Sequence, residues 1–131
     1  MIIAVCADDA LGLQFNHRRQ SKDAALRQRL LELAGGKLRV SPATAKQFDP
    51  GDTVSAGEDY LTAAQEGDWC FCEDTAYLDS AEKIEKIVLF RWNRRYPADV
   101  YFTFPGQWRK VSTEDFPGTS HETITQEVYI P

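Results

Sequence analysis

The segment best equipped for chemistry is NHRRQSKD, Asn16 to Asp23, which collects cationic and hydrogen-bonding side chains just before a helix pattern. Arg18 and Arg19 carry planar guanidinium groups that bind a carboxylate or a phosphate through two parallel hydrogen bonds. We expect Asn16 and Gln20 to make the adjacent loop contacts. The segment therefore predicts a site for an anionic ligand, with a solvated loop that only precedes a helix as the alternative.

Charge is unevenly distributed along the sequence. Residues 15–40 hold seven Lys or Arg and two Asp or Glu, whereas the whole chain has a net charge of −5. Arg27 follows Asp23 by four residues, so a helix would place both on one face. Arg27 could join the loop arginines at the mouth of a cleft, or it could pair with Asp23. The asymmetry indicates an anionic partner at one face, with a solvated helix flank as the alternative.

The composition argues against several function classes. A net charge of −5 does not suit general binding to nucleic acid or to an acidic membrane, and no apolar run approaches the length of a membrane span. Cys6, Cys70 and Cys72 lie in apolar runs and match neither a disulfide framework nor a zinc pattern. We therefore expect a cytoplasmic protein whose partner is a small molecule rather than nucleic acid or a membrane.

Motifs with a defined chemistry are absent. The sequence has no phosphate-binding loop, no G-x-G-x-x-G, no G-x-S-x-G and no cluster of metal ligands. His17 and His121 are the only histidines, and they could act as base and acid in a metal-free phosphodiester cleavage only if they met across a cleft. A loop or turn position without a catalytic role is the favoured interpretation of both.

The order of the secondary-structure patterns predicts the fold class. Strand patterns lie at residues 2–7, 37–41, 68–73, 86–93 and 99–104; helix patterns lie at 24–34, 43–48 and 58–67, with a partly helical stretch at 74–84; a terminal hairpin is expected from 108–116 and 121–130. Ser21 is expected to cap the first helix, with Asp23 in its first turn. The pattern predicts a single α/β domain over residues 1–131, with a mixed sheet flanked by helices and an antiparallel C-terminal hairpin.

Residue order and spacing over nearly the whole chain resemble the dihydrofolate reductase fold family. The opening strand is followed by Asp8, Gly12, an asparagine and a loop that leads into a helix at Asp23. LRVSPATAKQF lies where the family has a strand, a turn and a short helix. KIVLFRWNRRYPADVYF, with Asp99 and Phe102, and the closing WRKVSTEDF and SHETITQEVY resemble the family's late strands.

This resemblance implies a ligand cleft with particular residues in it. Asp23 matches the family's substrate-binding carboxylate, a catalytic group that accepts hydrogen bonds from the ligand and helps to move a proton onto it. Thr44 matches a position in the cofactor site. The resemblance therefore implies an anionic or heteroaromatic ligand and, for an enzyme, reduction by NADPH. A partner of the helix dipole is the alternative role for Asp23.

The cofactor apparatus departs from the family's pattern. CEDT (Cys72–Thr75) replaces the glycines that approach the pyrophosphate, and its two carboxylates would repel that group. SP (Ser41–Pro42) replaces the phosphate-binding Gly-Arg pair, and HRRQ (His17–Gln20) replaces the Trp-Pro pair of the mobile active-site loop. NADPH is thus the implied cofactor, but its phosphate-binding motifs are missing.

Two other function classes stay open. The chain also looks like a short, divergent bacterial branch that sometimes carries the label ribonuclease Z, although two histidines are too few for the metal site of that enzyme. An RNA-related activity would use the basic segment and would depend on salt. A non-catalytic interaction module that kept the fold and lost the cofactor is the other alternative, and it predicts a cleft narrowed or filled by side chains.

Overall fold

The middle strand of the main sheet is β1 (Ile2–Ala7), the apolar run that opens the sequence. In the computed structural model, which describes all 131 residues, β1 pairs in parallel with β6 (Trp69–Phe71) on one side and with β7 (Lys86–Arg91) on the other. Side chains of β1 enter the apolar clusters on both faces of the sheet, with Ile3 and Val5 in one cluster and Ile2 in the other, which explains why its sequence is apolar.

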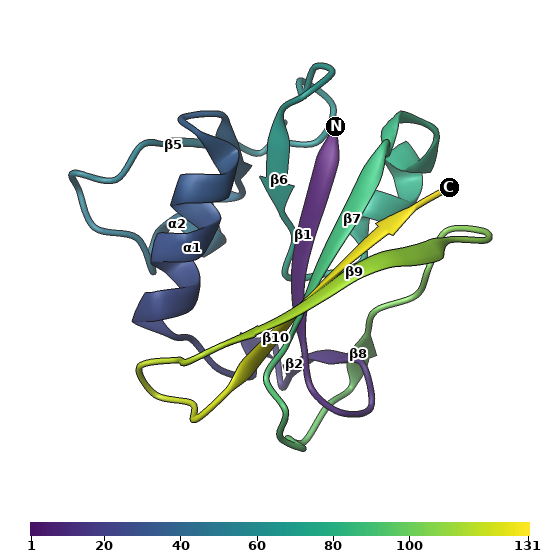
Figure 1. The fold of residues 1–131 in the computed structure, drawn as a ribbon. Helices are drawn as coiled ribbons and strands as arrows, with labels where there is room; N and C mark the ends of the chain where they lie inside the picture. The colour runs from purple at the N-terminus through teal and green to yellow at the C-terminus, as the bar shows by residue number, and fades with distance from the viewer.

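Seven strands form this sheet, in the order β5-β4-β6-β1-β7-β10-β9 (Figure 1). Beyond β6, the parallel pairing continues with β4 (Leu38–Val40) and β5 (Val54–Ala56). On the other side, β10 (Ile124–Ile130) pairs antiparallel with β7 and with β9 (Arg109–Phe116). The predicted α/β class, with a mixed sheet and an antiparallel C-terminal hairpin, is therefore confirmed.

A second sheet lies at the end of the main sheet toward which β1 runs (Figure 1). It consists of β3 (Arg18–Arg19), β2 (Gly12–Phe15) and β8 (Val100–Tyr101), all antiparallel. The sequence predicts only a loop before Gln20, but this loop contains the β2–β3 hairpin. Its turn residues Asn16 and His17 have φ of 52° and 62°, the left-handed backbone that two-residue hairpin turns require.

The first helix, α1 (Ala24–Ala34), packs its Leu26 and Leu30 onto one face of the main sheet. Its N-cap is Asp23, whose backbone is extended and whose side chain accepts from the second and third helical N–H groups. The prediction that Ser21 caps the helix with Asp23 in the first turn is therefore wrong. The Ser21 hydroxyl instead lies against the ring of His121.

The remaining helices are short. Ser41 caps α2 (Pro42–Ala45), which is shorter than the predicted helix at 43–48. Residues 58–67 form turns rather than the predicted helix, and the 3₁₀ helix η1 (Ala76–Lys83) occupies the partly helical stretch. Two apolar clusters fill the two faces of the main sheet, with α1 in one and Tyr77 of η1 in the other. These layers hold the loops at the carboxyl ends of the parallel strands in place.

Candidate functional site

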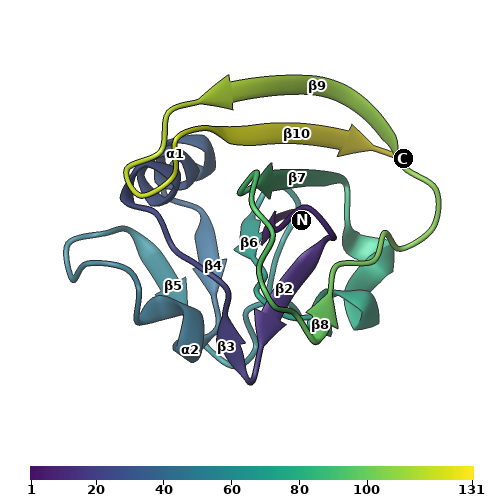
Figure 2. The same ribbon diagram turned by 90° about the horizontal axis from the view of Figure 1, so that it is seen from below.

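An open cleft of about 560 Å³ lies where α2, the β2–β3 hairpin and the loop after β6 come together. Figure 2 shows α2 beside β3 at this end of the molecule. Carboxyl ends of parallel strands commonly carry ligand sites because the loops that follow them converge. The cleft is lined by Gln14, His17, Arg18, Arg19, Ser21, Lys22, Ser41, Ala43, Thr44, Tyr60, Glu73 and Asp74.

Glu73 forms the centre of a hydrogen-bonded group in this cleft. Its carboxylate accepts from Arg19 Nε at 2.8 Å and from Arg19 Nη2 at 3.2 Å, a bidentate pair. The Thr44 hydroxyl donates to the same carboxylate at 2.8 Å. Arg19 therefore compensates the charge of Glu73, and both Arg19 and Thr44 already have partners within the protein.

Arg18 and Lys22 are the free cations of the cleft. Both side chains are exposed, and neither makes a hydrogen bond or an ion pair in the structure. His17 also lines the cleft and is exposed. After the Arg19–Glu73 pair is set aside, Asp74 is the one lining carboxylate that remains, so the unpaired charge of the cleft is positive.

Three residues that the sequence places at the ligand do not line the cleft. The backbone N–H of Asn16 donates to the carboxylate of Asp99 at 3.1 Å. Gln20 donates through Nε2 to Asp8 and to the carbonyl of Pro97, both at 3.2 Å. Arg27 extends from α1, and its Nη1 is buried without a hydrogen-bond partner. Arg18, Arg19 and Thr44 are the predicted ligand contacts that the structure brings together.

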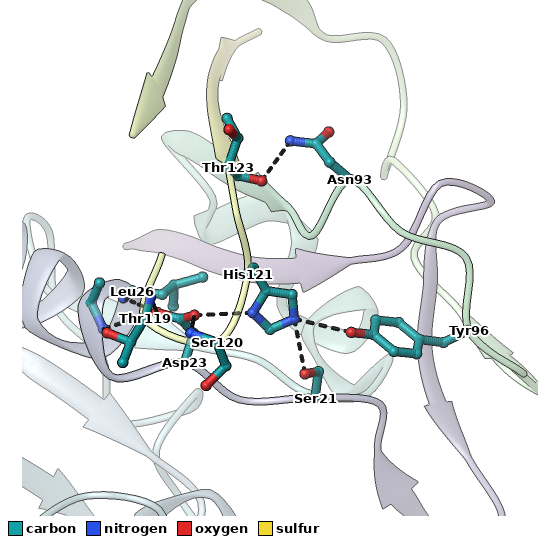
Figure 3. Close-up of polar contacts among 10 residues, drawn as sticks. Ser21, Asp23, Leu26, Asn93, Tyr96, Thr119, Ser120, His121 and Thr123 are labelled. Carbon is teal, nitrogen blue, oxygen red and sulfur yellow. Dashed lines mark hydrogen bonds and ion pairs between the residues drawn. The ribbon is translucent and has the colours of Figure 1, made fainter. Parts of the chain in front are cut away.

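Asp23 is buried and does not line the cleft; Figure 3 shows its carboxylate among Thr119, Ser120 and His121. Five groups donate to its two oxygens over 2.7–3.2 Å: the backbone N–H groups of Ala25, Leu26, Thr119 and Ser120 and ring Nδ1 of His121. A carboxylate offers about four lone-pair directions. In this arrangement Asp23 has no acceptor site left for a ligand, and it joins the start of α1 to the turn before β10.

These hydrogen bonds favour the charged form of Asp23. Burial alone would raise the pKa, but the hydrogen bonds from Thr119, His121 and Ser120 outweigh burial and lower the pKa of Asp23 from 3.8 to about 2. Asp8 behaves in the same way, because backbone N–H groups outweigh its burial and lower its pKa. Asp23 is therefore an ionised acceptor for His121 at any pH near neutrality.

The free energy of unfolding is expected to fall in acid, below about pH 4. A carboxyl whose pKa is lower in the folded state contributes stability that is complete above 3.8 and disappears as the pH falls through about 2. For Asp23 the difference corresponds to about 2 kcal/mol, and the lowered pKa of Asp8 adds to the same loss. Urea unfolding from neutral pH down to about pH 2 measures the effect. An Asp23→Asn variant with the same acid dependence would contradict this origin.

His121 lies between Asp23 and Ser21, and its ring stacks on Trp92 with centroids 4.5 Å apart. Its Nε2 is 3.1 Å from the Ser21 hydroxyl and 3.0 Å from the Tyr96 hydroxyl (Figure 3). An ionised carboxylate only accepts hydrogen bonds, so Nδ1 must carry a hydrogen. With the hydrogen on Nδ1, Nε2 is the ring atom that faces the Ser21 and Tyr96 hydroxyl groups.

Ser21 and His121 line different hollows. Ser21 lines the large cleft, whereas His121 lines a second hollow of about 400 Å³. The other residues that line this second hollow are Trp92, Asn93, Arg94, Ser120, Glu122 and Thr123.

His17 is exposed on the hairpin turn and shares no hydrogen bond with His121. The base-and-acid pair of histidines considered from the sequence therefore does not form in this structure.

Sequence reasoning did not identify Ser21, Tyr96 or His121 as members of one group. Ser21 and His121 are 100 residues apart, so no local spacing signals their contact. The one sequence clue is chemical, because a serine, an aspartate and one of only two histidines are available for such a group. The sequence gives no register that would bring them together.

The structure contains neither a cluster of metal ligands nor a membrane-spanning helix. No group of three or more His, Cys, Asp or Glu side chains could hold a metal ion. None of the helices combines the length and apolar character needed to cross a bilayer.

Comparison with known proteins gives no independent assignment. No protein-family model matches the chain, and a search of the curated proteins finds no significant relative.

Proposed function

We propose that the protein binds a small anionic ligand in the cleft between α2, the β2–β3 hairpin and the loop after β6. The observation that carries this proposal is the pair of unpaired cations, Arg18 and Lys22, in an open lining. A carboxylate or phosphate would supply the missing counter-charge, and Arg18 can meet it with two parallel hydrogen bonds.

The lining favours an anion over an uncharged heteroaromatic ring. Ala43 and Tyr60 are the only two hydrophobic residues among the twelve that line the cleft. Sites for flat organic ligands are usually lined mainly by hydrophobic and aromatic side chains. Charge and hydrogen bonding, rather than apolar contact, would therefore supply most of the affinity.

We place the chain in the dihydrofolate reductase-like superfamily as part of the same proposal. The parallel strands around β1 and the antiparallel β9–β10 hairpin support it. Reduction by NADPH is the activity that this membership implies, but Thr44, the matching cofactor contact, already donates to Glu73 at 2.8 Å. We therefore favour an anion site without nicotinamide chemistry.

The open cleft also favours ligand binding over a purely structural interaction module. That alternative expects side chains to fill the cleft, whereas about 560 Å³ is open beside Ser21 and Thr44. Binding of RNA through the basic segment would involve the same Arg18 and Lys22.

Titration with inorganic pyrophosphate, followed by amide chemical shifts, is expected to perturb residues around Arg18, Lys22 and Ser41. An Arg18→Gln/Lys22→Gln double variant should weaken binding by about tenfold or more, because a hydrogen bond to a charged group contributes about 1.5–3 kcal/mol. NADPH and a short single-stranded RNA are titrated in parallel to identify the class of anion that binds best.

The matched control is an Arg95→Gln/Lys37→Gln double variant, which removes the same two charges from exposed positions outside the cleft. It should bind pyrophosphate nearly as well as the unmodified protein. Equal weakening in both double variants would attribute the binding to net charge and would end the proposal of a defined site.

A further inference from the structure

We propose that Ser21, His121 and Asp23 form a hydrolytic triad, in which Ser21 is the nucleophile that attacks acyl esters bound in the cleft. The site rests on the proposed function only for its preference for esters that carry a negative charge. The nucleophile, the base and the carboxylate that orients the base are defined by their own geometry, independently of what Arg18 and Lys22 bind.

The three side chains form a continuous line of hydrogen bonds (Figure 3). Ser21 Oγ is 3.1 Å from His121 Nε2, and His121 Nδ1 is 3.0 Å from Asp23 Oδ2. Both distances lie within the range that joins a nucleophile to its base and a base to the group that orients it. Because Nδ1 donates to Asp23, the lone pair of Nε2 is available to take the hydroxyl proton of Ser21.

Exposure to solvent increases from Asp23 through His121 to Ser21, as a nucleophilic site requires. The side chain of Asp23 is 0% exposed and that of His121 is 2% exposed. Ser21, in contrast, is only partly buried and lines the open cleft. Water and substrate therefore reach the nucleophile, while the imidazole is held in one orientation by Asp23 on its edge and Trp92 on its face.

The carboxylate is equipped to hold the base rather than to react. Its other four donors are backbone N–H groups, which fix both oxygens and keep the charge of Asp23 in place. A fixed negative charge 3.0 Å from Nδ1 stabilises the imidazolium that forms when His121 takes a proton. Asp23 is thus a positioning residue, and Ser21 and His121 are the catalytic residues.

Tyr96 restrains this line in the resting protein. The Tyr96 hydroxyl is 3.0 Å from Nε2 of His121, the same atom that faces Ser21. The centroids of the Tyr96 and His121 rings are 6.5 Å apart. A neutral imidazole has one lone pair at Nε2, so the two hydroxyl groups compete for it. Removing the hydroxyl of Tyr96 should therefore leave the lone pair of His121 to Ser21 and raise the reactivity of the serine.

The reaction follows from these positions. Ser21 Oγ attacks the carbonyl carbon of the ester while its proton passes to His121 Nε2. The bond from the carbonyl carbon to the alcohol oxygen breaks, and the departing alcohol takes that proton. Water then attacks the acyl-serine by the same route, so one ester and one water give one carboxylic acid and one alcohol. Lys22 and Arg18 line the same cleft as Ser21, so their positive charge would favour the negative charge that develops on the carbonyl oxygen.

The test uses an uncharged fluorophosphonate probe on the full protein, with the modified residue located by peptide mass spectrometry. We expect one adduct, on Ser21, and none in Ser21→Ala. His121→Gln should slow labelling by about a hundredfold or more, and Ser112→Ala, on exposed β9, should label normally. The labelling rate should follow the titration of one group as the pH changes. If Asp23 positions His121, this pH profile should change in Asp23→Asn, whereas a purely structural role for Asp23 would leave the profile unchanged.

Tyr96→Phe is the variant whose result a folding defect cannot imitate, because it is expected to label several-fold faster than the unmodified protein. No adduct on Ser21 in folded protein, or an unchanged or slower rate in Tyr96→Phe, would overturn the triad. Labelling without pyrophosphate binding would instead overturn only the anionic ligand, since the probe carries no charge. Pyrophosphate binding without labelling would overturn only the triad.

Discussion

Replacing Asp23 with asparagine is expected to lower the free energy of unfolding by about 3 kcal/mol, because two buried donors would lose their acceptor. Asparagine keeps the shape of the side chain but turns one acceptor into an NH₂ donor. That group would face the Ser120 N–H and His121 Nδ1, which lie 2.7 and 3.0 Å from Oδ2. Buried donors left without an acceptor cost about 1–3 kcal/mol each.

Urea unfolding at neutral pH measures this loss as a shift of the midpoint with little change in slope. Asp9→Asn is the matched control, because Asp9 is exposed and its carboxylate accepts no hydrogen bond within the protein. The control should change the free energy of unfolding by less than about 0.5 kcal/mol. A similar loss in both variants would show that charge, rather than the network around Asp23, is responsible.

Gly118→Ala is expected to destabilise the protein by about 2–3 kcal/mol, although it adds a single methyl group. A Cβ atom at Gly118 would lie 2.6 Å from the carbonyl oxygen of His121, 2.8 Å from Asp23 Oδ2 and 3.0 Å from Ile124 Cδ1. The first contact is with backbone and the second with a carboxylate that its donors hold in place, so neither can move aside cheaply. The turn at residues 118–121 would therefore have to move away from Asp23.

Thermal or urea unfolding of Gly118→Ala measures this effect, and Gly51→Ala is its control. A Cβ at Gly51 meets nothing within 4 Å, so this variant should be neutral or slightly stabilising. The crystal structure of Gly118→Ala would also be expected to show His121 displaced from Asp23. Equal stability of the two alanine variants would refute the close packing of the 118–121 turn on the start of α1.

The strands around β1 could be predicted because burial on both faces leaves a continuous apolar run in β1 and in β7. The prediction of a helix at 58–67 is wrong, because there the local pattern does not decide the structure. The apolar residues of this segment have helical spacing, yet Tyr60, Leu61 and Ala64 are buried against the sheet from a series of turns. Packing against the sheet overrides the local pattern, which a sequence alone does not reveal.

Part of the candidate site could be predicted from the sequence, and part could not. The positions of Arg18 and Thr44 in the cleft could be expected, because loops after neighbouring strands meet at one edge of the sheet. The partner of Asp23 could not, because His121 lies 98 residues away and reaches it only through the docking of β10. The N-cap role of Asp23 was likewise hidden, since Ser21 is as good a cap by residue type.

The distance along the chain between the two halves of the Asp23 network has a consequence for folding. Hydrogen bonds that join residues 21–25 to residues 119–121 close loops of 94 to 100 residues, and that entropy cost is offset only once β10 lies beside β7. The network must therefore assemble late, after most of the sheet exists. A partly folded intermediate with its C-terminal hairpin undocked would have an α1 that lacks part of its cap contacts and a His121 without its partner. Chemistry at Ser21 would thus be confined to molecules that have completed folding.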